Sequence, residues 1–449
     1  MILKMPKSII WIALLAIVLR LALLAYVSSG NYSEPFPLLE PDAREYYRIG
    51  QNLALSGEFT EGAVTNFEPD SFRTPVYPFL IALSLKVTGS IWALLILQCL
   101  LAGVLVVAVY ALGRRHMPHK FALLAALIIA LDPVGIVYGS LLMTESLFLL
   151  LLTLALLLFT KQSFDDNAAG RDLAWVGVLL GLATLTRPIG LFVPILLALI
   201  YAIFKKKFAP ALIMLFTFAL VIMPWSVRNK LVFDSWSLSA VGGYNLYYYN
   251  AMRFVSARDG LDPDTAHTLF DKRLEDKYGP ASTERSLRNA SIQSSEGLEI
   301  IKGAPLPYAF FHAKTLLPFF FSDGIREVTD LVGWTDRSYV DLRGAIISGD
   351  IPALWAGVKS MGASGLLLII GAIFWALVFA FWVLGIVLGK RERFATISLF
   401  LSGALLAGLS GVVTTVRFRY AISSLLLVMA VYGLYEIYLW RSDGLYESR

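Results

Sequence analysis

The sequence contains a single cysteine, Cys99, and few charged residues: Asp, Glu, Lys and Arg make up 16% of its 449 residues. One cysteine excludes a disulfide framework and a metal site built from cysteines. No internal repeat stands out, which argues against the transporter folds built from inverted repeats. What the chain has in abundance is apolar surface, with 57% hydrophobic residues and a mean hydropathy of +0.68. This composition predicts a polytopic membrane protein rather than a water-soluble domain.

The basic residues gather in short clusters between the apolar runs, although the formal net charge is only +5. Such clusters are typical of cytoplasmic loops and argue against nucleic-acid binding. The clusters are Lys4 and Lys7; Arg114, Arg115 and Lys120; Lys161 and Arg171; Lys205, Lys206 and Lys207; Lys390, Arg391 and Arg393; and Arg441. If all of them face the cytoplasm, an even number of crossings must separate neighbouring clusters.

That parity, with roughly 20 residues needed for each helix that spans the membrane, predicts an all-α fold of about ten transmembrane helices with both termini in the cytoplasm. The run from Ile9 to Val27 is interpreted as a retained first helix. The apolar run 173–204 has basic residues at both ends, so it is divided into two short crossings that meet at Pro188. The chain is thereby expected to lie in the inner or plasma membrane.

The predicted organisation has three parts. Residues 1–228 form an N-terminal transmembrane module with a first outer loop at 29–90. Residues 229–361 form an extracytoplasmic region of short helices, because their periodicity is helical and polar rather than alternating. Residues 362–449 supply the last transmembrane helices.

This topology brings a set of charged residues to one level, the outer membrane surface. The set is Asp42, Glu45, Arg73, Glu145, Arg187, Arg228, Arg417 and Arg419. Several cations with a few carboxylates at headgroup level suit a phosphorylated lipid with a leaving group to be displaced. Each residue also has a plain structural interpretation: Asp42 is typical of a helix cap, and arginines at this level are typical of side chains that extend to lipid headgroups.

Six segments in a fixed order resemble the GT-C glycosyltransferases, in particular the branch similar to dolichyl-phosphate-mannose protein mannosyltransferases and the aminoarabinose transferase of lipid A. The segments are "PDAREYYRIGQNLALSGEF", "FRTPVYPFLIAL", "DPVGIVYGSLLMTESLF", "GVLLGLATLTRPIGLFVP", "PWSVRNKLVFDSW" with "GGYNLYYYN", and "RFRYAISSLLLVMAVYGLYEI". The resemblance spans almost the whole chain. The chain differs from the mannosyltransferases in having Ala43 after Asp42, where they carry glutamate, and in lacking a large β-trefoil insert.

The resemblance implies roles for individual residues. Asp42 corresponds to the essential acidic residue of the first outer loop and Glu145 to the acidic residue of the second outer turn, with Glu45 as a secondary catalytic candidate. The implied ligands of the donor phosphate are Arg73, Arg187, Arg228 and Arg419. Weaker candidates for contacts with the sugar or the acceptor are Tyr46, Tyr247 and Asn245.

The implied function is transfer of a sugar from a polyprenyl-phosphate donor to an acceptor outside the cytoplasm, with inversion of the anomeric centre. A transporter or flippase of lipid-linked sugars and a non-catalytic membrane scaffold are the alternatives. We expect that no tightly bound metal is required, although Asp42 and Glu145 have the hard oxygen ligands that suit Mg²⁺ or Mn²⁺. The expected partners are the donor lipid, the bilayer and an acceptor of unknown kind.

Asp42 is predicted to take the proton from the acceptor nucleophile. A carboxylate beside an apolar wall and an anionic phosphate is expected to have a raised pKa, which suits a base near neutral pH. Glu40 is predicted to be a solvated charge of the loop.

Overall fold

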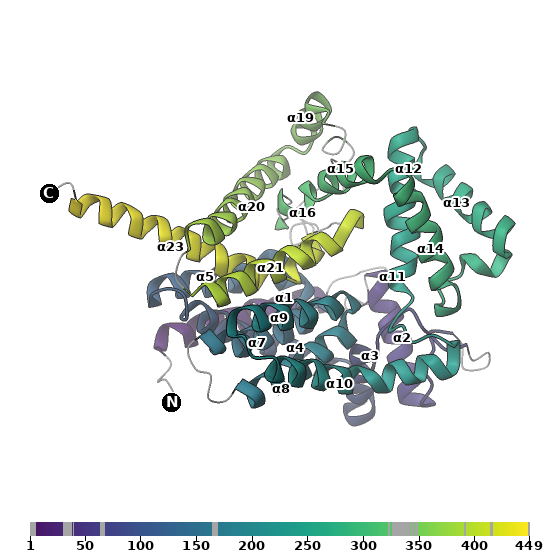
Figure 1. Ribbon diagram of the computed structural model, residues 1–449, viewed down its shortest axis with the longest axis horizontal. Helices are drawn as coiled ribbons and strands as arrows, with labels where there is room; N and C mark the ends of the chain where they lie inside the picture. The colour runs from purple at the N-terminus through teal and green to yellow at the C-terminus, as the bar shows by residue number, and fades with distance from the viewer. Residues whose placement is uncertain are drawn as a thin grey trace.

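The computed structural model describes residues 6–29, 38, 40–62, 68–163, 169–321, 324–325, 342, 345, 349–389, 392–413 and 416–447. Within these residues the secondary structure is helical and contains no strand. The all-α prediction is therefore confirmed. Figure 1 shows long helices packed side by side, with α1 beginning and α23 ending at the same side of the molecule.

Eight helices in the described part of the chain are long and apolar enough to cross a membrane. They are α1 (Lys7–Ser28), α4 (Trp92–Gly113), α7 (Glu145–Thr160), α9 (Val193–Lys205) with the 3-10 turn η3 (Pro188–Phe192) before it, α10 (Ala209–Phe233), α20 (Ala363–Leu388), α21 (Arg393–Ser410) and α23 (Ser423–Glu447). The other two of the ten predicted spans are the helices α5 (His119–Leu131) and α8 (Ala169–Thr186). α5 packs against α4 and α23, and α8 packs against α7 and α10. The chain is a multi-pass membrane protein.

The predicted break at Pro188 is present. α8 ends at Thr186, Arg187 has an extended backbone with φ −142° and ψ 118°, and Pro188 begins η3. An extended conformation before proline is expected, because the proline ring disfavours a helical residue at that position. The break lifts the Arg187 side chain out of the apolar helix interior and aims it at the site described below.

A second break separates α5 from the short helix α6 (Pro133–Tyr138). Asp132 caps α6, because its Oδ1 accepts a hydrogen bond from the Val134 N–H at 3.1 Å. Arg20 of α1 is buried nearby, and its Nη1 donates to the carbonyl of Ala130 at 3.2 Å. Charged side chains inside the bundle therefore bind backbone groups that the helix break exposes.

The segments outside the spans form a layer of short helices at one end of the bundle (Figure 1). These are α2 (Pro41–Leu55), α3 (Val76–Thr88), α11 (Val241–Tyr244), α12 (Met252–Asp259), α13 (Pro263–Tyr278), α14 (Leu287–Gly303), α15 (Pro305–Thr315), α16 (Leu317–Phe321) and α19 (Ile351–Ser360). The described part of residues 229–361 thus consists of short helices and irregular segments, as its sequence predicts. α10 runs past residue 228 to Phe233, so the boundary expected at 228 falls inside a helix.

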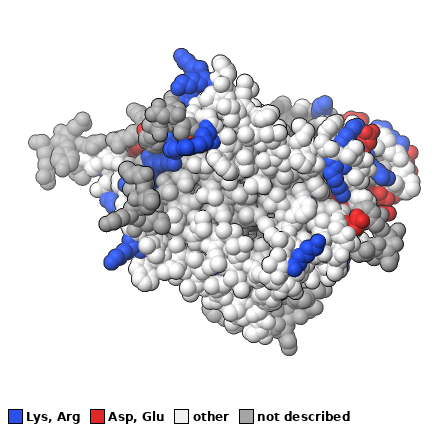
Figure 2. Space-filling view, turned by 90° about the horizontal axis from the view of Figure 1, so that it is seen from below, with Lys and Arg blue, Asp and Glu red and all other residues white. Residues whose placement is uncertain are grey.

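Charged side chains are nearly absent from a broad band across the face of the molecule that Figure 2 shows. Figure 2 shows this band between two charged ends. At one end the visible charges are mostly Lys and Arg, whereas at the other end basic and acidic side chains are mixed. An uncharged band of this kind is what a protein surface in contact with lipid requires.

Candidate active site

A cavity of about 1810 Å³ lies between the layer of short helices and the ends of the spans next to that layer. One part of its wall is apolar and includes successive positions on one face of α20: Leu368, Ile369, Ala372, Ile373 and Ala376. Another part is charged and carries Glu40, Asp42, Glu45, Arg73, Arg187, Arg285 and Arg417. The cavity therefore joins a surface suited to a hydrocarbon chain to a cluster of guanidinium and carboxylate groups.

The first turns of α2 supply two of the carboxylates. Asp42 and Glu45 are three residues apart, so they project from the same face of the helix. Arg73 lies across from them: its Nη2 contacts Asp42 Oδ1 at 2.6 Å, and its Nε donates to Glu45 Oε2 at 2.7 Å. Asp70 Oδ1 accepts a hydrogen bond from the Arg73 N–H at 2.9 Å and fixes the loop that presents this guanidinium. The Cζ atom of the Arg73 guanidinium lies 4.9 Å from the centre of the Tyr46 ring.

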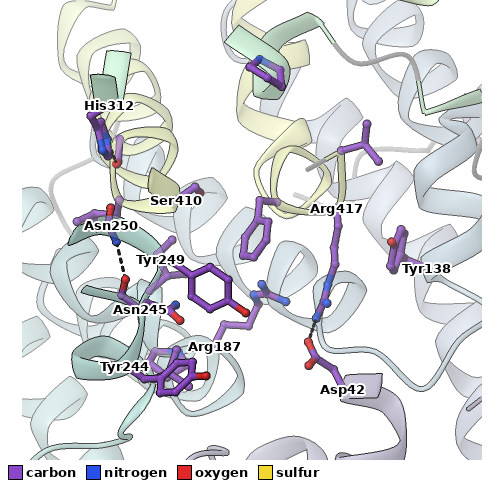
Figure 3. Close-up of a pocket in the computed structure, with 18 of the residues that line it drawn as sticks. Asp42, Tyr138, Arg187, Tyr244, Asn245, Tyr249, Asn250, His312, Ser410 and Arg417 are labelled. Atoms are coloured by element: carbon purple, nitrogen blue, oxygen red, sulfur yellow. Dashed lines mark hydrogen bonds and ion pairs between the residues drawn. The ribbon is translucent and has the colours of Figure 1, made fainter. Parts of the chain in front are cut away.

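The segment between the last two spans supplies another arginine of the site. Arg417, on the short helix α22 (Val416–Tyr420), donates from Nη2 to Asp42 Oδ2 at 2.6 Å and from Nε to Glu145 Oε1. Arg187 Nη1 donates to the same Glu145 oxygen and to Thr144 Oγ1 at 2.9 Å. Glu145 begins α7 and its side chain is fully buried. One buried carboxylate therefore holds two guanidinium groups together. Figure 3 shows these two groups, those of Arg187 and Arg417, at the cavity wall.

Arg285, which lies before α14 in the extramembrane region, completes the chain of contacts. Its two terminal nitrogens each contact a Glu45 oxygen at 3.1 Å, and its guanidinium lies 3.8 Å from the centre of the Phe72 ring. The cluster alternates in sign along its length, and we call it the alternating network: Arg285, Glu45, Arg73, Asp42, Arg417, Glu145 and Arg187.

The expected rise in the Asp42 pKa is wrong. Burial by itself raises the pKa of this carboxyl, but the adjacent guanidinium groups of Arg73 and Arg417 outweigh burial and hold the Asp42 pKa well below its ordinary value. Each Asp42 oxygen accepts a short hydrogen bond from one arginine. The sequence interpretation considered the apolar wall and the phosphate, and it did not include the two cations that the fold brings to Asp42.

Glu40 is not the fully solvated loop charge that the sequence predicts. It is half-buried at the start of α2 and lines the cavity. Burial raises its pKa, with a smaller opposing effect from Arg417. Glu40 is therefore a further carboxylate of the site and, after Asp42, the second candidate for the base.

Five of the predicted site residues belong to the alternating network, namely Asp42, Glu45, Arg73, Glu145 and Arg187, and others lie elsewhere. Arg228 donates to the Asp70 carbonyl at 2.8 Å and lies over the Trp225 ring, and Arg419 donates to the Phe319 carbonyl at 3.1 Å and lies over the Trp375 ring. Neither residue is among those that line the cavity in the described part of the chain. The geometry therefore does not support these two arginines as phosphate ligands.

Of the three weaker candidates for contacts with the sugar or the acceptor, two lie at the cavity and one does not. Tyr46 and Asn245 line the cavity. Tyr247 is buried within the extramembrane layer, where its hydroxyl donates to the Phe270 carbonyl at 2.9 Å.

Arg285 and Arg417 are the site residues that the sequence interpretation left out of the phosphate ligands. The pattern "RFRY" indicates two arginines, but they are two residues apart and so point to different sides of a helix. Arg285 follows no pattern that connects it to the first outer loop. Only the fold brings it to Glu45.

The carboxylates do not fit a metal site in this arrangement. Both oxygens of Asp42 and both of Glu45 accept hydrogen bonds from arginine, and Glu145 Oε1 accepts two. Among the residues that the structure describes, no group of three or more His, Cys, Asp or Glu side chains is arranged to hold an ion. No cofactor is established for the chain.

Comparison with known proteins agrees with this architecture. Residues 72–227 match the family model described as dolichyl-phosphate-mannose-protein mannosyltransferase. The archaeal oligosaccharyltransferase AglB from Archaeoglobus fulgidus, solved with an inhibitory peptide and a dolichol-phosphate, is 15% identical and superposes with a TM-score of 0.54 over 97% of this chain. The chain has the GT-C fold. The resemblance predicted from the six sequence segments is confirmed.

The GT-C chain described here covers 51% of AglB, so it spans about half the length of that relative. A second structure of the A. fulgidus enzyme, in complex with Zn and sulfate, has 15% identity and a TM-score of 0.50, with 95% of this chain and 48% of that one covered. ArnT from Cupriavidus metallidurans bound to undecaprenyl phosphate gives 16% identity and a TM-score of 0.38, with 94% and 77% covered. No curated protein sequence matches the chain.

Proposed function

We propose that this GT-C protein transfers a sugar from a polyprenyl-phosphate donor to an acceptor nucleophile. The observation that carries the proposal is the single cavity in which an apolar face of α20 leads to the guanidinium groups of Arg187 and Arg417. A lipid-linked sugar has this same division, since a hydrocarbon chain, an anionic phosphate and a polar sugar follow one another in one molecule. The family model and the dolichol-phosphate held by AglB favour the same class of donor.

The phosphate is bound by arginine. Arg187 and Arg417 both contact Glu145 Oε1 and both line the cavity, so a phosphate between them meets two planar forks able to donate in pairs. Arg73 supports the arrangement through Asp42. Arg187 and Arg417 stabilise the negative charge that develops on the departing phosphate.

Asp42 is the proposed base, and donor binding activates it. In the free protein its two oxygens are held by Arg73 and Arg417, which makes it a weak proton acceptor. A phosphate that takes hydrogen bonds from Arg417 removes part of this restraint and raises the Asp42 pKa. The acceptor hydroxyl then gives its proton to Asp42 as its oxygen bonds to the anomeric carbon. The bond from that carbon to the phosphate oxygen breaks on the opposite face, so the centre is inverted and polyprenyl phosphate leaves.

The reaction side is proposed to be extracytoplasmic, with both termini in the cytoplasm. The mostly basic end of the molecule in Figure 2 supports this orientation, because Lys and Arg accumulate on the cytoplasmic side of membrane proteins. Lipid donors suit this side, since nucleotide sugars are confined to the cytoplasm.

The reaction is proposed to need no tightly bound metal, because the arginines of the alternating network neutralise the phosphate. Exhaustive chelation of the purified protein should leave transfer unchanged. Transfer that stops on chelation and returns with Mn²⁺ would contradict this part of the proposal without affecting the rest.

The test of the function is release of free polyprenyl phosphate by the purified protein from a radiolabelled polyprenyl-phosphate sugar. A flippase moves such a lipid from one leaflet of a vesicle membrane to the other without cleaving it. A scaffold neither moves nor cleaves it. Intact donor after prolonged incubation with a range of acceptors, in protein shown to be folded, would refute the proposal.

A further inference from the structure

The part of the cavity across from Asp42 and Arg417 carries polar side chains that have no charge. Figure 3 shows Tyr244, Asn245, Tyr249 and Asn250 on one side and Asp42 with Arg417 on the other. These four uncharged residues, which we call the neutral wall, are half-buried and line the cavity. Figure 3 also shows the Tyr249 side chain extending across the cavity toward Arg187.

The backbone explains how four neighbouring residues come to face the same way. Residues Asn245–Ala251 form a π-helical turn, η4. A π-helix pairs residues five apart, whereas an α-helix pairs residues four apart, and π-turns inside helices occur frequently at functional sites. In addition, the side-chain Nδ2 of Asn250 donates to the Asn245 carbonyl at 2.9 Å, and the rings of Tyr244 and Tyr249 lie with their centres 6.1 Å apart.

The hydroxyl groups of this tyrosine-rich turn divide into two kinds. Tyr247 donates to the Phe270 carbonyl at 2.9 Å and Tyr248 donates to Asp271 Oδ1 at 2.7 Å, and both side chains are buried. Within the described residues, by contrast, the hydroxyls of Tyr244 and Tyr249 and the side-chain amide of Asn245 make no hydrogen bond to the protein. Three side chains of the neutral wall, Tyr244, Asn245 and Tyr249, are thus available to a ligand, whereas Asn250 uses its amide to hold the wall in place.

The neutral wall is held in place from behind. Asn250 Oδ1 accepts a hydrogen bond from the Tyr308 hydroxyl at 2.9 Å, and His312 Nε2 lies 3.0 Å from the Gly408 carbonyl at the end of α21. Gly411 has a φ of +60°, and a side chain at this position would meet Asn250 Oδ1 at 2.9 Å. The close approach of η4 to the end of α21 therefore fixes the wall to a membrane-spanning helix.

We propose that the neutral wall binds an uncharged, hydroxyl-bearing sugar unit. Aromatic rings offer their faces to the apolar side of a sugar ring, and amide and phenol groups exchange hydrogen bonds with its hydroxyls. Arg285 lies 5.9 Å from the centre of the Tyr244 ring, but it is paired with Glu45. The two arginines proposed for the phosphate, Arg187 and Arg417, contact Glu145 instead. The inference rests on the proposed function, and the sugar belongs either to the donor or to a glycan acceptor.

Whether the bound sugar belongs to the donor is tested by measuring the affinity of the purified full-length protein for three lipids. Undecaprenyl phosphate reports the phosphate and lipid contacts alone, and undecaprenyl-phosphate-mannose and undecaprenyl-phosphate-glucose add a neutral sugar. Tyr249→Phe and Asn245→Ala should each lower the sugar-dependent gain in affinity by about two- to tenfold, as expected for one lost hydrogen bond, and leave the affinity for undecaprenyl phosphate unchanged. Tyr248→Phe is the matched control, because it removes a hydroxyl that faces Asp271, and it should keep the whole gain.

Whether the bound sugar belongs to a glycan acceptor is tested with mannobiose as a soluble neutral probe. Saturation-transfer NMR on the protein saturated with undecaprenyl phosphate should show mannobiose contacts that weaken in Tyr249→Phe and Asn245→Ala but not in Tyr248→Phe. If these two variants alter neither the sugar-dependent gain nor the mannobiose signal, the neutral wall does not bind sugar. Wild-type protein that binds none of the polyprenyl phosphates refutes the proposed function itself, which is a different result.

Discussion

Replacing Arg417 with lysine should damage sugar transfer although the positive charge is kept. Arg417 uses two different nitrogens for its two carboxylates, Nη2 for Asp42 at 2.6 Å and Nε for Glu145. Lysine has one nitrogen at the end of a flexible chain and cannot reproduce the planar fork. One of the two carboxylates therefore loses one of its two arginine partners, and the cavity loses half of the clamp proposed for the phosphate.

The expected loss of sugar transfer is large because Arg417 and Glu145 are buried. The Arg417 side chain is 14% exposed and that of Glu145 is 0% exposed, so water screens this contact little. A hydrogen bond to a charged group contributes about 1.5–3 kcal/mol to stability. If the same contact stabilises the transition state, its loss slows transfer by about 10- to 150-fold, since 1.36 kcal/mol corresponds to a factor of ten.

The assay is release of polyprenyl phosphate per folded molecule, with the folded fraction taken from thermal unfolding. Arg419→Lys is the matched control, because Arg419 lies on the same short helix but contacts the Phe319 carbonyl and the Trp375 ring. It should lower the melting temperature and keep transfer per folded molecule within about threefold. Normal transfer by Arg417→Lys, or a greater loss of specific activity in Arg419→Lys, would refute the assignment of Arg417 to the phosphate.

Three further predictions concern other groups of the site. Arg187→Lys should weaken the affinity for undecaprenyl phosphate about tenfold or more despite the retained charge, and an unchanged affinity would leave Arg187 as a structural partner of Glu145. Asp42→Asn should reduce transfer by at least about 100-fold and Glu40→Gln much less; the reverse order would assign the proton to Glu40. Asp70→Asn should flatten the dependence of stability on pH, because burial raises the Asp70 pKa to about 6. In the wild type the proton on Asp70 stabilises the native state fully below about pH 4. Up to about 3 kcal/mol of the free energy of unfolding is lost as the pH rises through 6. Thermal unfolding at pH 4.5 and 7.5 measures this loss, and an equal loss in Asp70→Asn would exclude Asp70 as its source.

The parts of this structure that the sequence predicts are those with a local physical cause. The apolar runs identify the spans, a proline at 188 identifies the break before η3, and the spacing of Asp42 and Glu45 identifies a helix face. Glu145 is recognisable because a carboxylate in an apolar hairpin needs a partner. Each of these inferences uses neighbours within about one helical turn.

The parts that the sequence does not predict depend on contacts between distant segments or on unusual backbone. Arg285 meets Glu45 across 240 positions of the chain, and no periodicity records that contact. The sequence prediction names Tyr247, whereas the π-turn η4 determines which residues share a face and Tyr249 is the one that lines the cavity. The direction of the Asp42 pKa shift was mispredicted for the same reason, because its two cations come from residues 73 and 417.

Under the proposed function, the alternating network explains how a site for an anionic lipid stays stable without that lipid. Four arginines gathered beside an apolar wall would repel one another and lose water at high cost, so each one contacts a carboxylate. A donor phosphate does not have to find free cations, because it replaces contacts that the carboxylates already make. The exchange also links binding to chemistry: Arg417 cannot turn from Asp42 to a phosphate without making Asp42 a better base. A lipid without phosphate leaves Asp42 paired with both arginines, so proton transfer is confined to the complex in which a leaving group is present.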